Sequence, residues 1–478
     1  MKSVTKHHHL IIVYIFLLFL YGMGTGCQVG KEYKRPATEL PTQYRGAPET
    51  ADSAGIAATP WKIFFAYPEL EELIDSAIAK NYDLQLAIRN MESARLTLQQ
   101  AKLGQLPDIV FQATASSTRS SDNSLNGISA QQFLGTSHVE DYNANIGLTW
   151  EADIWGKIRS RKEAALADYL QTTEARKAVQ TQLVSDVAQG FYNLLMLDDQ
   201  LAVARKNVML NDSTLRIIRL QYDAGQVTAL AIEQADAQRH TAALLVPQLE
   251  QSIQIQENAL RILAGELPSS INRNMSIDNL DVPERFSAGV PASLLGQRPD
   301  VQAMEFALQA ANARVGVAKA NMYPSLVITA NAGVNSFQFA NWFSVPASLF
   351  GMAAGGLTQP IFQRKQLKTQ YELAMLEREK SVIRFRQSVL NAVGEVSNAL
   401  VKLEKLKEQR VIASERTDTL QLATRNAGLL FKSGMANYLE VLTAQGAALQ
   451  SELETVDLKR QHLNSFVELY RSLGGGWK

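Results

Sequence analysis

Cys27 is the only cysteine in the 478-residue chain, and it follows a segment with the pattern of a secretory signal. Lys2 and Lys6 give this segment a positive start, and residues 10–21 form an apolar run that is short for a transmembrane helix. A lone cysteine cannot form a disulfide within the chain. We therefore expect residues 1–26 to be removed and Cys27 to carry a covalent lipid, with an incidental thiol as the alternative.

Two neighbours of Cys27 bear on this prediction. Lipoprotein signals usually carry leucine three residues before the cysteine, and Gly24 occupies that position here. In bacterial lipoproteins, an aspartate directly after the cysteine resembles a signal that retains the protein in the inner membrane. Gln28 follows Cys27 in this chain and therefore favours the outer membrane.

No residue pattern typical of an enzyme or a metal site stands out. The sequence has no G-x-x-x-x-G-K-[ST] phosphate loop and no His-Glu-x-x-His motif. Residues 7–9 are histidines in the segment expected to be removed, and the other three are scattered: His138, His240 and His462. The 47 basic and 47 acidic residues cancel. We expect no catalysis, no cofactor beyond the lipid, no metal and no nucleic-acid partner.

The sequence contains an internal duplication. Asp83 and Pro107 are matched by Asp300 and Pro324, each 217 positions later (300−83 and 324−107). Later in the chain the offset is 209, as between Gly225 and Gly434 (434−225). A repeat of this length indicates one large duplicated unit rather than a solenoid of short repeats. Length alone allows about three domains, but the duplication favours one interlocked body.

Helical patterns dominate both copies. Apolar and small residues alternate in steps of three and four, as in supercoiled helices. They are Leu84, Ala87, Met91, Ala94, Leu98 and Ala101, and in the second copy Val301, Met304, Leu308, Ala311, Val315 and Ala318. Longer proline-free stretches follow at 159–222 and 366–431, and each ends before a glycine that can reverse the chain. Helices 231–263 and 439–473 then return, and Pro247 should interrupt and kink the first.

Each copy also contains a segment with the two-residue period of β-strands. Residues 109–116 and 143–150 alternate on either side of a polar loop, whereas 326–335 alternate clearly and 350–359 poorly. Strands of about ten residues with one apolar and one polar face suit a membrane, with lipid on one side and water on the other. Two soluble hairpins packed on helices are the alternative. Trp150 and Trp342 suit an interfacial aromatic girdle or simple packing.

Four strands cannot close a sheet by themselves. Open edges leave backbone groups unpaired, which lipid does not tolerate, and the smallest known membrane barrels have about eight strands. If these strands cross a membrane, several chains must share one barrel.

Several motifs in a fixed order resemble one known family. They are Val29-Gly30 with Tyr33 and Pro36; Trp61, Phe64, Pro68, Leu70, Leu73 and Ile74; Trp150-Glu-Ala-Asp153-Ile-Trp-Gly156-Lys157; Arg298-Pro299-Asp300 with Glu305; and Gly434, Tyr438-Leu-Glu440-Val and Ala444-Gln445. The chain from Cys27 almost to Lys478 is thereby similar to the outer-membrane factors of tripartite efflux systems, the TolC-like channels. The likeness is greatest to their lipoprotein branch, the NodT-like efflux outer-membrane lipoproteins.

The resemblance implies an α+β membrane protein. Three internally duplicated chains would form a 12-strand β-barrel, four strands from each, continuous with a long periplasmic α-helical barrel. In this chain the parts would be a signal peptide at 1–26, a lipidated extended segment at 27–67, a first repeat at 68–265, a linker at 266–299, a second repeat at 300–474 and a tail at 475–478. The membrane hairpins would lie at 107–151 and 324–360, and the helical turns at 222–228 and 431–438.

The resemblance also implies two functional regions. A periplasmic gate would contain a ring of Glu440 carboxylates, packing around Phe431, and Thr443. The turns that meet a periplasmic adaptor protein would comprise Gly225, Gln226, Thr228, Ser433, Gly434 and Asn437. The implied partners are two further copies of the chain, the adaptor, an inner-membrane RND-type pump and outer-membrane lipid.

The expected function is that of a passive outer-membrane exit duct for small toxic compounds, driven by the inner-membrane pump. A type I protein-secretion duct of the same fold and a lipid-anchored coiled-coil scaffold without a pore are the alternatives. Substrate selection would lie in the pump, and the eleven methionines do not cluster in a way that favours copper or silver.

Overall fold

The computed structural model of the chain describes residues 29–46, 56–283 and 287–478. The predicted signal segment and Cys27 lie outside these residues, as does Gln28. The description begins at Val29, two residues after the predicted lipidation site.

The described residues form two compact units, and each unit takes segments from both copies of the repeat. The strand unit consists of residues 29–36, Ser93–Leu170 and Phe306–Ile383. The helical unit consists of the remaining described residues.

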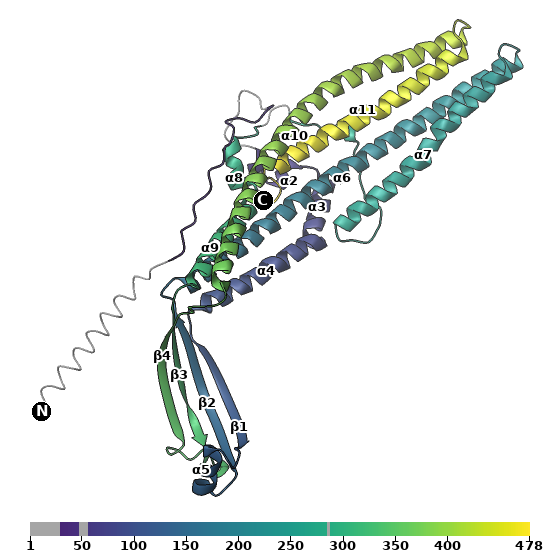
Figure 1. Ribbon diagram of the computed structural model, residues 1–478. Coiled ribbons are helices and arrows are strands. Elements are labelled where there is room, and N and C mark those ends of the chain that lie inside the picture. The colour runs from purple at the N-terminus through teal and green to yellow at the C-terminus, as the bar shows by residue number, and fades with distance from the viewer. Residues whose placement is uncertain (1–28, 47–55, 284–286) are drawn as a thin grey trace. The chain divides into compact units, whose positions relative to one another are not determined.

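Corresponding helices of the two copies have equal lengths (Figure 1). α4 (Tyr82–Leu103) and α9 (Pro299–Ala320) each have 22 residues. α6 (Lys157–Asp223) and α10 (Gln366–Lys432) each have 67, and α7 (Ala229–Leu263) and α11 (Tyr438–Ser472) each have 35. These equal lengths confirm the duplication, because unrelated helices would not match in all three pairs.

The strand unit contains one antiparallel sheet in the order β1-β2-β3-β4. The strands are β1 (Asp108–Arg119), β2 (His138–Ala152), β3 (Ser325–Ser336) and β4 (Leu349–Thr358). The prediction of four strands per chain is confirmed. β2 and β3 pair directly, so the two hairpins, one from each copy, form a single surface.

The strand register separates apolar from polar side chains, because residues directly opposite each other share a face. One row across the sheet is Ile109, Leu148, Ala330 and Ala353. The row beside it on the opposite face is Val110, Gly147, Asn331 and Met352, and a further row on that face contains Thr114, Asn143 and Asn335. The asparagines thus gather on one face, as the alternation in the sequence predicts.

The segment between β1 and β2 differs from the predicted polar loop. It contains a helix, α5 (Leu125–Leu134), whose N-cap Ser124 accepts a hydrogen bond from the backbone N–H of Gly127 at 3.1 Å. Gly135 ends the helix in the left-handed conformation. The helix was missed because its capping serine and its glycines are also typical of turns.

α7 also differs from the sequence prediction. Pro247 lies inside it, and the helix continues to Leu263, so the predicted interruption is wrong. The pyrrolidine ring removes one backbone donor but does not end a helix that is supported along its length by packing.

The core of the helical unit lies where short helices meet the long ones. Phe65, the residue that ends α2 (Trp61–Phe64), and Leu70 and Ile74 of α3 (Pro68–Lys80) are buried in one cluster with Phe191 of α6. The ring of Phe64 stacks on Tyr470 of α11 with 3.9 Å between centroids. The remaining short helices are η1 (Ile56–Ala58), η2 (Ile277–Asn279), η3 (Pro291–Ser293), α8 (Leu294–Gln297) and η4 (Phe339–Asn341).

The Arg298-Pro299-Asp300 motif anchors the start of α9. The Arg298 side chain is buried, its Nη2 lies 2.6 Å from Asp300 Oδ2, and its Nη1 lies 3.0 Å from Glu395 Oε2 of α10. Nη1 also donates to the backbone carbonyl of Ser472 at 2.9 Å. A buried guanidinium needs such partners, because an unpaired charge would carry a large desolvation cost.

The motif that leaves the first hairpin joins it to the second hairpin and to α6. Asp153 accepts from the backbone N–H groups of Ile158 and Arg159, both at 2.9 Å, and so caps the start of α6. Trp155 donates through Nε1 to the carbonyl of Pro324, the residue before β3, at 2.6 Å.

His462 of α11 gives the helical unit a pH-dependent stability. Burial, with the nearby charges of Arg410, Lys407 and Lys459, lowers the pKa of His462 to about 4, and Arg410 Nη1 donates to its Nδ1 at 3.0 Å. In the unfolded chain the pKa is about 6.5. The contribution of about 3 kcal/mol or less is complete above pH ~6.5 and is lost as the pH falls toward 4, where only the unfolded form binds the proton.

We expect His462→Gln to reduce the fall in thermal midpoint between pH 7 and pH 4, because glutamine accepts the Arg410 hydrogen bond without titrating. Circular dichroism melts at both pH values measure this. His240→Gln, at an exposed histidine of α7, serves as the control. An unchanged pH dependence in His462→Gln would contradict the assignment.

Candidate functional site

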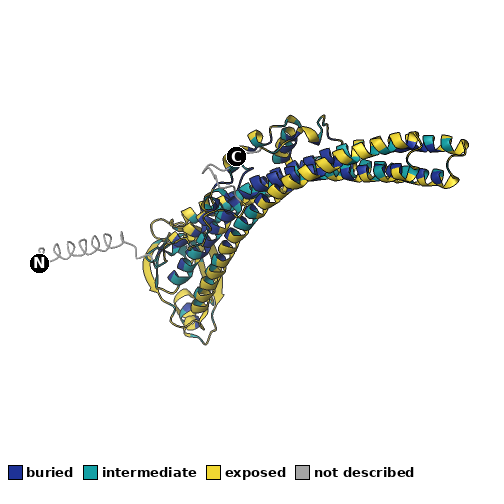
Figure 2. Ribbon diagram, turned by 90° about the horizontal axis from the view of Figure 1, so that it is seen from above, coloured by how far each residue is buried: buried dark blue, intermediate teal, exposed yellow. Residues whose placement is uncertain are grey.

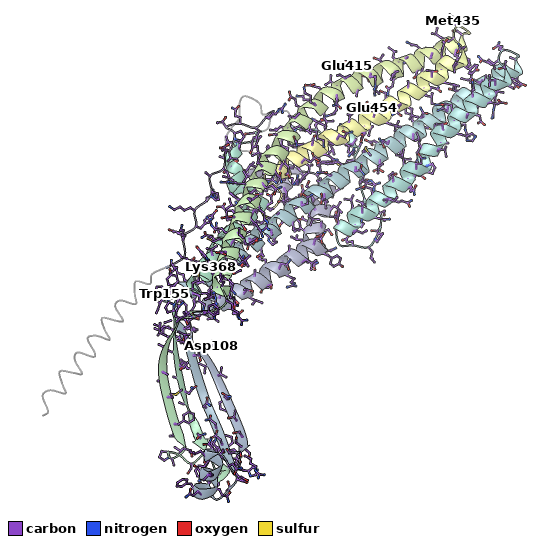
Figure 3. The ribbon with its side chains drawn as sticks, viewed as in Figure 1. Asp108, Trp155, Lys368, Glu415, Met435 and Glu454 are labelled. Atoms are coloured by element: carbon purple, nitrogen blue, oxygen red, sulfur yellow. The ribbon has the colours of Figure 1, made fainter. Side chains whose placement is uncertain are left out.

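The two helical hairpins, α6–α7 and α10–α11, end in turns of the same kind (Figures 1 and 3). Gly225 and Gly434 each adopt a φ of 72°, a left-handed value that favours glycine. The following N–H groups bond five residues back, Gln226 to the carbonyl of Gln221 at 2.8 Å and Met435 to that of Leu430 at 2.9 Å. This is the Schellman pattern of a capped helix end.

Phe431 is a core residue of the second turn. Its side chain is 4% exposed and belongs to a cluster that draws on four helices: Leu215 and Ile218 of α6, Ala231 and Ala235 of α7, and Val441 and Leu442 of α11. The cluster holds the ends of the two hairpins together within the helical unit. Packing around Phe431 is therefore a property of the single chain.

Glu440 has a different environment from Phe431. It is exposed at the third position of α11, where its backbone N–H donates to Oδ1 of the N-cap residue Asn437 at 3.1 Å. Asn437 Nδ2 donates in return to Glu440 Oε1 at 3.1 Å. This reciprocal pair resembles a capping box, in which each residue satisfies a group of the other. The carboxylate remains open to solvent, and Thr443 is exposed one turn later.

The corresponding positions of the first copy are arranged differently. Ala231, 209 positions before Glu440 (440−231), is fully buried, whereas Tyr222, the counterpart of Phe431 (431−222), is 44% exposed. At these two positions the first copy thus has neither an exposed carboxylate nor a buried aromatic ring. The two turns are alike in backbone and unlike in side-chain chemistry.

A buried polar contact that the sequence did not predict lies near Phe431. Gln445 Nε2 of α11 donates to Thr214 Oγ1 of α6 at 2.8 Å. Gln445 Oε1 and Asn211 Oδ1 are buried without a partner among the described residues. Thr214, Gln445 and Phe431 line a cavity of about 890 Å³ between α6, α10 and α11. Gln445 falls on the buried side of α11, a signal that its helical spacing could have given.

The predicted adaptor-contacting residues are all exposed. Gly225, Gln226 and Thr228 lie at the first turn, and Ser433, Gly434 and Asn437 at the second. Asn437 caps its helix with its side chain, whereas Thr228 makes no side-chain cap bond. The neighbouring side chain of Met435, marked in Figure 3, is 72% exposed. Small polar groups and uncovered apolar side chains are thus available at both turns.

The sheet is uncovered in the single chain (Figure 2). Every residue of β1 is exposed, including Ile109 at 67% and Phe111 at 69%, and all of β4 except Phe350 is exposed. An apolar face of this extent requires another apolar environment. No helix among the described residues is long and apolar enough to cross a membrane.

Aromatic side chains lie at both ends of the strands. At the end nearer the helices, the rings of Trp155 and Tyr323 are 4.9 Å apart, and Trp150 Nε1 donates to the carbonyl of Gln105 at 2.9 Å. The other end carries a cluster of Tyr142, Phe339, Trp342 and Phe343, with centroids 4.9–6.1 Å apart. Two aromatic bands separated by strands of this length are the pattern of membrane-interface girdles.

The residues after Cys27 are held against the strand unit. The backbone N–H of Val29 donates to the carbonyl of Trp155 at 3.4 Å, and Lys319 Nζ donates to the carbonyl of Val29 at 3.3 Å. A Cβ on Gly316 would lie 2.9 Å from Ser160 Oγ and 3.4 Å from the Cα of Gly30. Glycines at both positions therefore allow the N-terminal segment to pass directly against α9.

No group of three or more histidine, cysteine or acidic side chains that could hold a metal ion occurs in the described ranges.

Comparison with known proteins gives consistent matches. The family described as outer membrane efflux protein matches residues 73–266 and 290–475. The toluene efflux pump outer membrane protein TtgI of Pseudomonas putida is 29% identical over 476 residues, covering 97% of each chain. The probable outer membrane lipoprotein SilC of Salmonella typhimurium is 27% identical and covers 95% of this chain and 96% of its own.

A solved structure of the outer-membrane channel OprN has the same fold. Its TM-score is 0.86 at 22% identity, and the match covers 94% of this chain and 100% of that one.

We expect Phe431→Ala to loosen the ends of the helical hairpins, because removal of a buried phenylalanine ring costs about 3–5 kcal/mol. Amide hydrogen exchange in α10 and α11 near the turn should become faster. Met435→Ala, at an exposed side chain of the same turn, is the control and should leave exchange unchanged. Equal exchange in the two variants would show that Phe431 does not hold the turn.

Proposed function

This chain belongs to the family of outer membrane efflux proteins, and we propose that it works as the passive exit duct of a tripartite efflux pump. The observation that carries the proposal is the uncovered four-stranded sheet, whose strands β2 and β4 are each followed along the chain by a helix of 67 residues. A sheet with a lipid-compatible face and a polar face suits the wall of a pore. The long helices suit the part that extends toward the pump.

The assembly that we propose is a homotrimer. The unpaired edges of β1 and β4 require partners, and three chains supply twelve strands, an even number above the minimum of about eight. The number three comes from the family resemblance. Closure by a second and third copy would satisfy the edges and place the asparagine-bearing face toward the water-filled interior.

Cys27 is proposed as the lipid attachment point. The N-terminal segment is fixed at Val29 beside Trp155, and two residues can span no more than about 7 Å from there. The lipid would therefore lie close to the aromatic band at the helix-proximal end of the strands. The mass of the N-terminal peptide from the mature protein tests this: the expected peptide begins at Cys27 and carries acyl groups.

A gate is proposed at the second helical turn. Three Glu440 carboxylates would form an exposed acidic ring, and the packed Phe431 would hold the turn in place behind them. The capping role of Glu440 explains the residue equally well in a single chain, so the test must separate charge from capping.

The function test is single-channel recording of the assembled protein in planar bilayers. We expect a conducting pore that prefers cations, and we expect Glu440→Gln to lower the potassium-to-chloride permeability ratio severalfold, because glutamine keeps the capping geometry and removes the charge. Asn437→Ala is the control, since it removes the cap, worth about 1 kcal/mol, and keeps the charge.

Two results would count against these proposals. Unchanged ion selectivity in Glu440→Gln would contradict the proposal of an acidic ring. The absence of conductance in correctly assembled protein would contradict the duct proposal and favour a scaffold without a pore.

Adaptor binding is proposed at the two helical turns, where polar side chains are exposed beside uncovered apolar ones. We expect Gln226→Cys and Ser433→Cys to form crosslinks with the periplasmic adaptor in cells, because these positions would contact it. The crosslinks can be assigned to the introduced thiols, since the chain has no other cysteine than Cys27. Gln85→Cys, exposed on α4, is the matched position away from the turns. Equal crosslinking at all three positions would reject the turns as the contact.

The relatives favour efflux over protein secretion, since TtgI is a toluene efflux pump outer membrane protein. The enzyme alternative has no support, because the matched family is one of efflux proteins. We therefore propose a channel without a catalytic step, in which the inner-membrane pump supplies the energy.

A further inference from the structure

A cavity of about 540 Å³ lies between the N-terminal segment and two helices of the strand unit. Its walls are residues 29–32 and Lys34 of the segment, one side of α9 near Gly316, and one side of α10 near Met375. The volume lies within the range of ligand sites, which is roughly 300–1,000 Å³.

The walls of this cavity are held in place by hydrogen bonds. Lys319 Nζ donates to the carbonyl of Val29, and Asn312 Nδ2 donates to the carbonyl of Lys31 at 2.9 Å. Arg378 Nε of α10 donates in turn to Asn312 Oδ1 at 3.0 Å. The three walls are therefore linked to one another through named side chains, and the cavity is a fixed feature of the unit.

The cavity lining carries an excess of positive charge. Its basic residues are Lys31, Lys34, Lys319 and Arg378, and its acidic residues are Glu32 and Glu379. The bonds of Lys319 and Arg378 described above go to uncharged oxygens, so they leave both positive charges without a neutralising partner at that contact. Such an arrangement favours an anion, and phosphate oxygens suit both types of side chain.

Apolar side chains line the same cavity. Val29, Val315, Tyr371 and Met375 contribute to its walls. A free inorganic anion would not use these surfaces, whereas a molecule with an anionic head and a hydrocarbon part would use both.

The cavity lies where the helices give way to the strands. Lys319 is the residue before the end of α9, and β3 begins at Ser325. Tyr371 lies in the second turn of α10, which follows the end of β4 at Thr358. If the strands cross the outer membrane, as the proposed function holds, this level corresponds to the lipid headgroups of the periplasm-facing leaflet.

We propose that this cavity binds an anionic phospholipid. Lys319 and Arg378 contact its phosphate, Lys31 and Lys34 add positive charge at the entrance, and an acyl chain lies along Val315 and Met375. The lipid carried by Cys27 is the weaker candidate, since a neutral acyl group leaves the basic side chains without a partner. A bound phospholipid would fix the N-terminal segment against α9 and α10.

Native mass spectrometry of the full assembled protein in neutral detergent tests this proposal. Dioctanoyl phosphatidylglycerol is the probe, and dioctanoyl phosphatidylcholine is the uncharged-headgroup comparison. We expect selective retention of phosphatidylglycerol, weakened at least about tenfold by the double variant Lys319→Gln and Arg378→Gln, in which hydrogen-bond donors remain and the charges are lost. Lys380→Gln, an exposed neighbour on α10 paired with Glu377, is the matched control and should bind normally.

A cavity-filling variant gives an independent measurement. Val315→Trp keeps every charge and should also weaken phosphatidylglycerol binding. Equal retention of the two lipids, or displacement of phosphatidylglycerol by inorganic phosphate at the same concentration, would overturn the proposal. Retention that appears only in Cys27→Ala would assign the cavity to the chain's own acyl group and would also overturn it.

Single-channel conductance separates this proposal from the proposed function on which it rests. The variants at Lys319, Arg378, Val315 and Lys380 should conduct like the unaltered protein. Normal conductance with no lipid selectivity would reject the lipid site alone, whereas loss of conductance in the unaltered protein would reject the duct.

Discussion

The unpaired edges of the four-stranded sheet constrain the rest of this structure. β1 and β4 each pair on one side only, and almost every residue of both strands is exposed. In lipid an unpaired backbone N–H or C=O costs several kcal/mol, so an open edge of about ten residues cannot persist there. We therefore propose that further copies of the chain cover these edges.

The two copies of the duplicated unit have the same backbone elements but differ in their side chains. The helix pairs keep their lengths, and both turns keep a left-handed glycine. Phe431 is buried where Tyr222 is exposed, and Glu440 is exposed where Ala231 is buried. The two copies therefore share the backbone geometry of the turn and differ in its side-chain chemistry. The proposed gate depends on that difference.

Much of the fold could be predicted from periodicity in the sequence. The three-four spacing of Leu84 to Ala101, the alternation after Pro107 and the glycines at 225 and 434 each reflect a local physical preference. Helix α5 was not predicted, because Ser124 and Gly127 favour turns as well as helix caps. The predicted interruption at Pro247 was wrong, because packing can support a helix through a proline. Contacts between distant segments have no local signature.

The same limit applies to the candidate site. The exposure of Glu440 and of the turn residues followed from their places in the sequence, but the Thr214–Gln445 pair joins residues 231 positions apart. The cavity beside the N-terminal segment depends on Gly30 meeting Gly316, which no single-segment pattern reveals. The role of Cys27 remains a prediction, since it lies outside the described residues.

The number of chains in the assembled, membrane-extracted particle tests the central claim most directly. Native mass spectrometry measures it from the ratio of the particle mass to the mass of one chain. The account predicts three chains per particle and twelve strands in one closed barrel. A particle of one chain that conducts ions would contradict it, because four strands with two open edges would then have crossed the membrane alone.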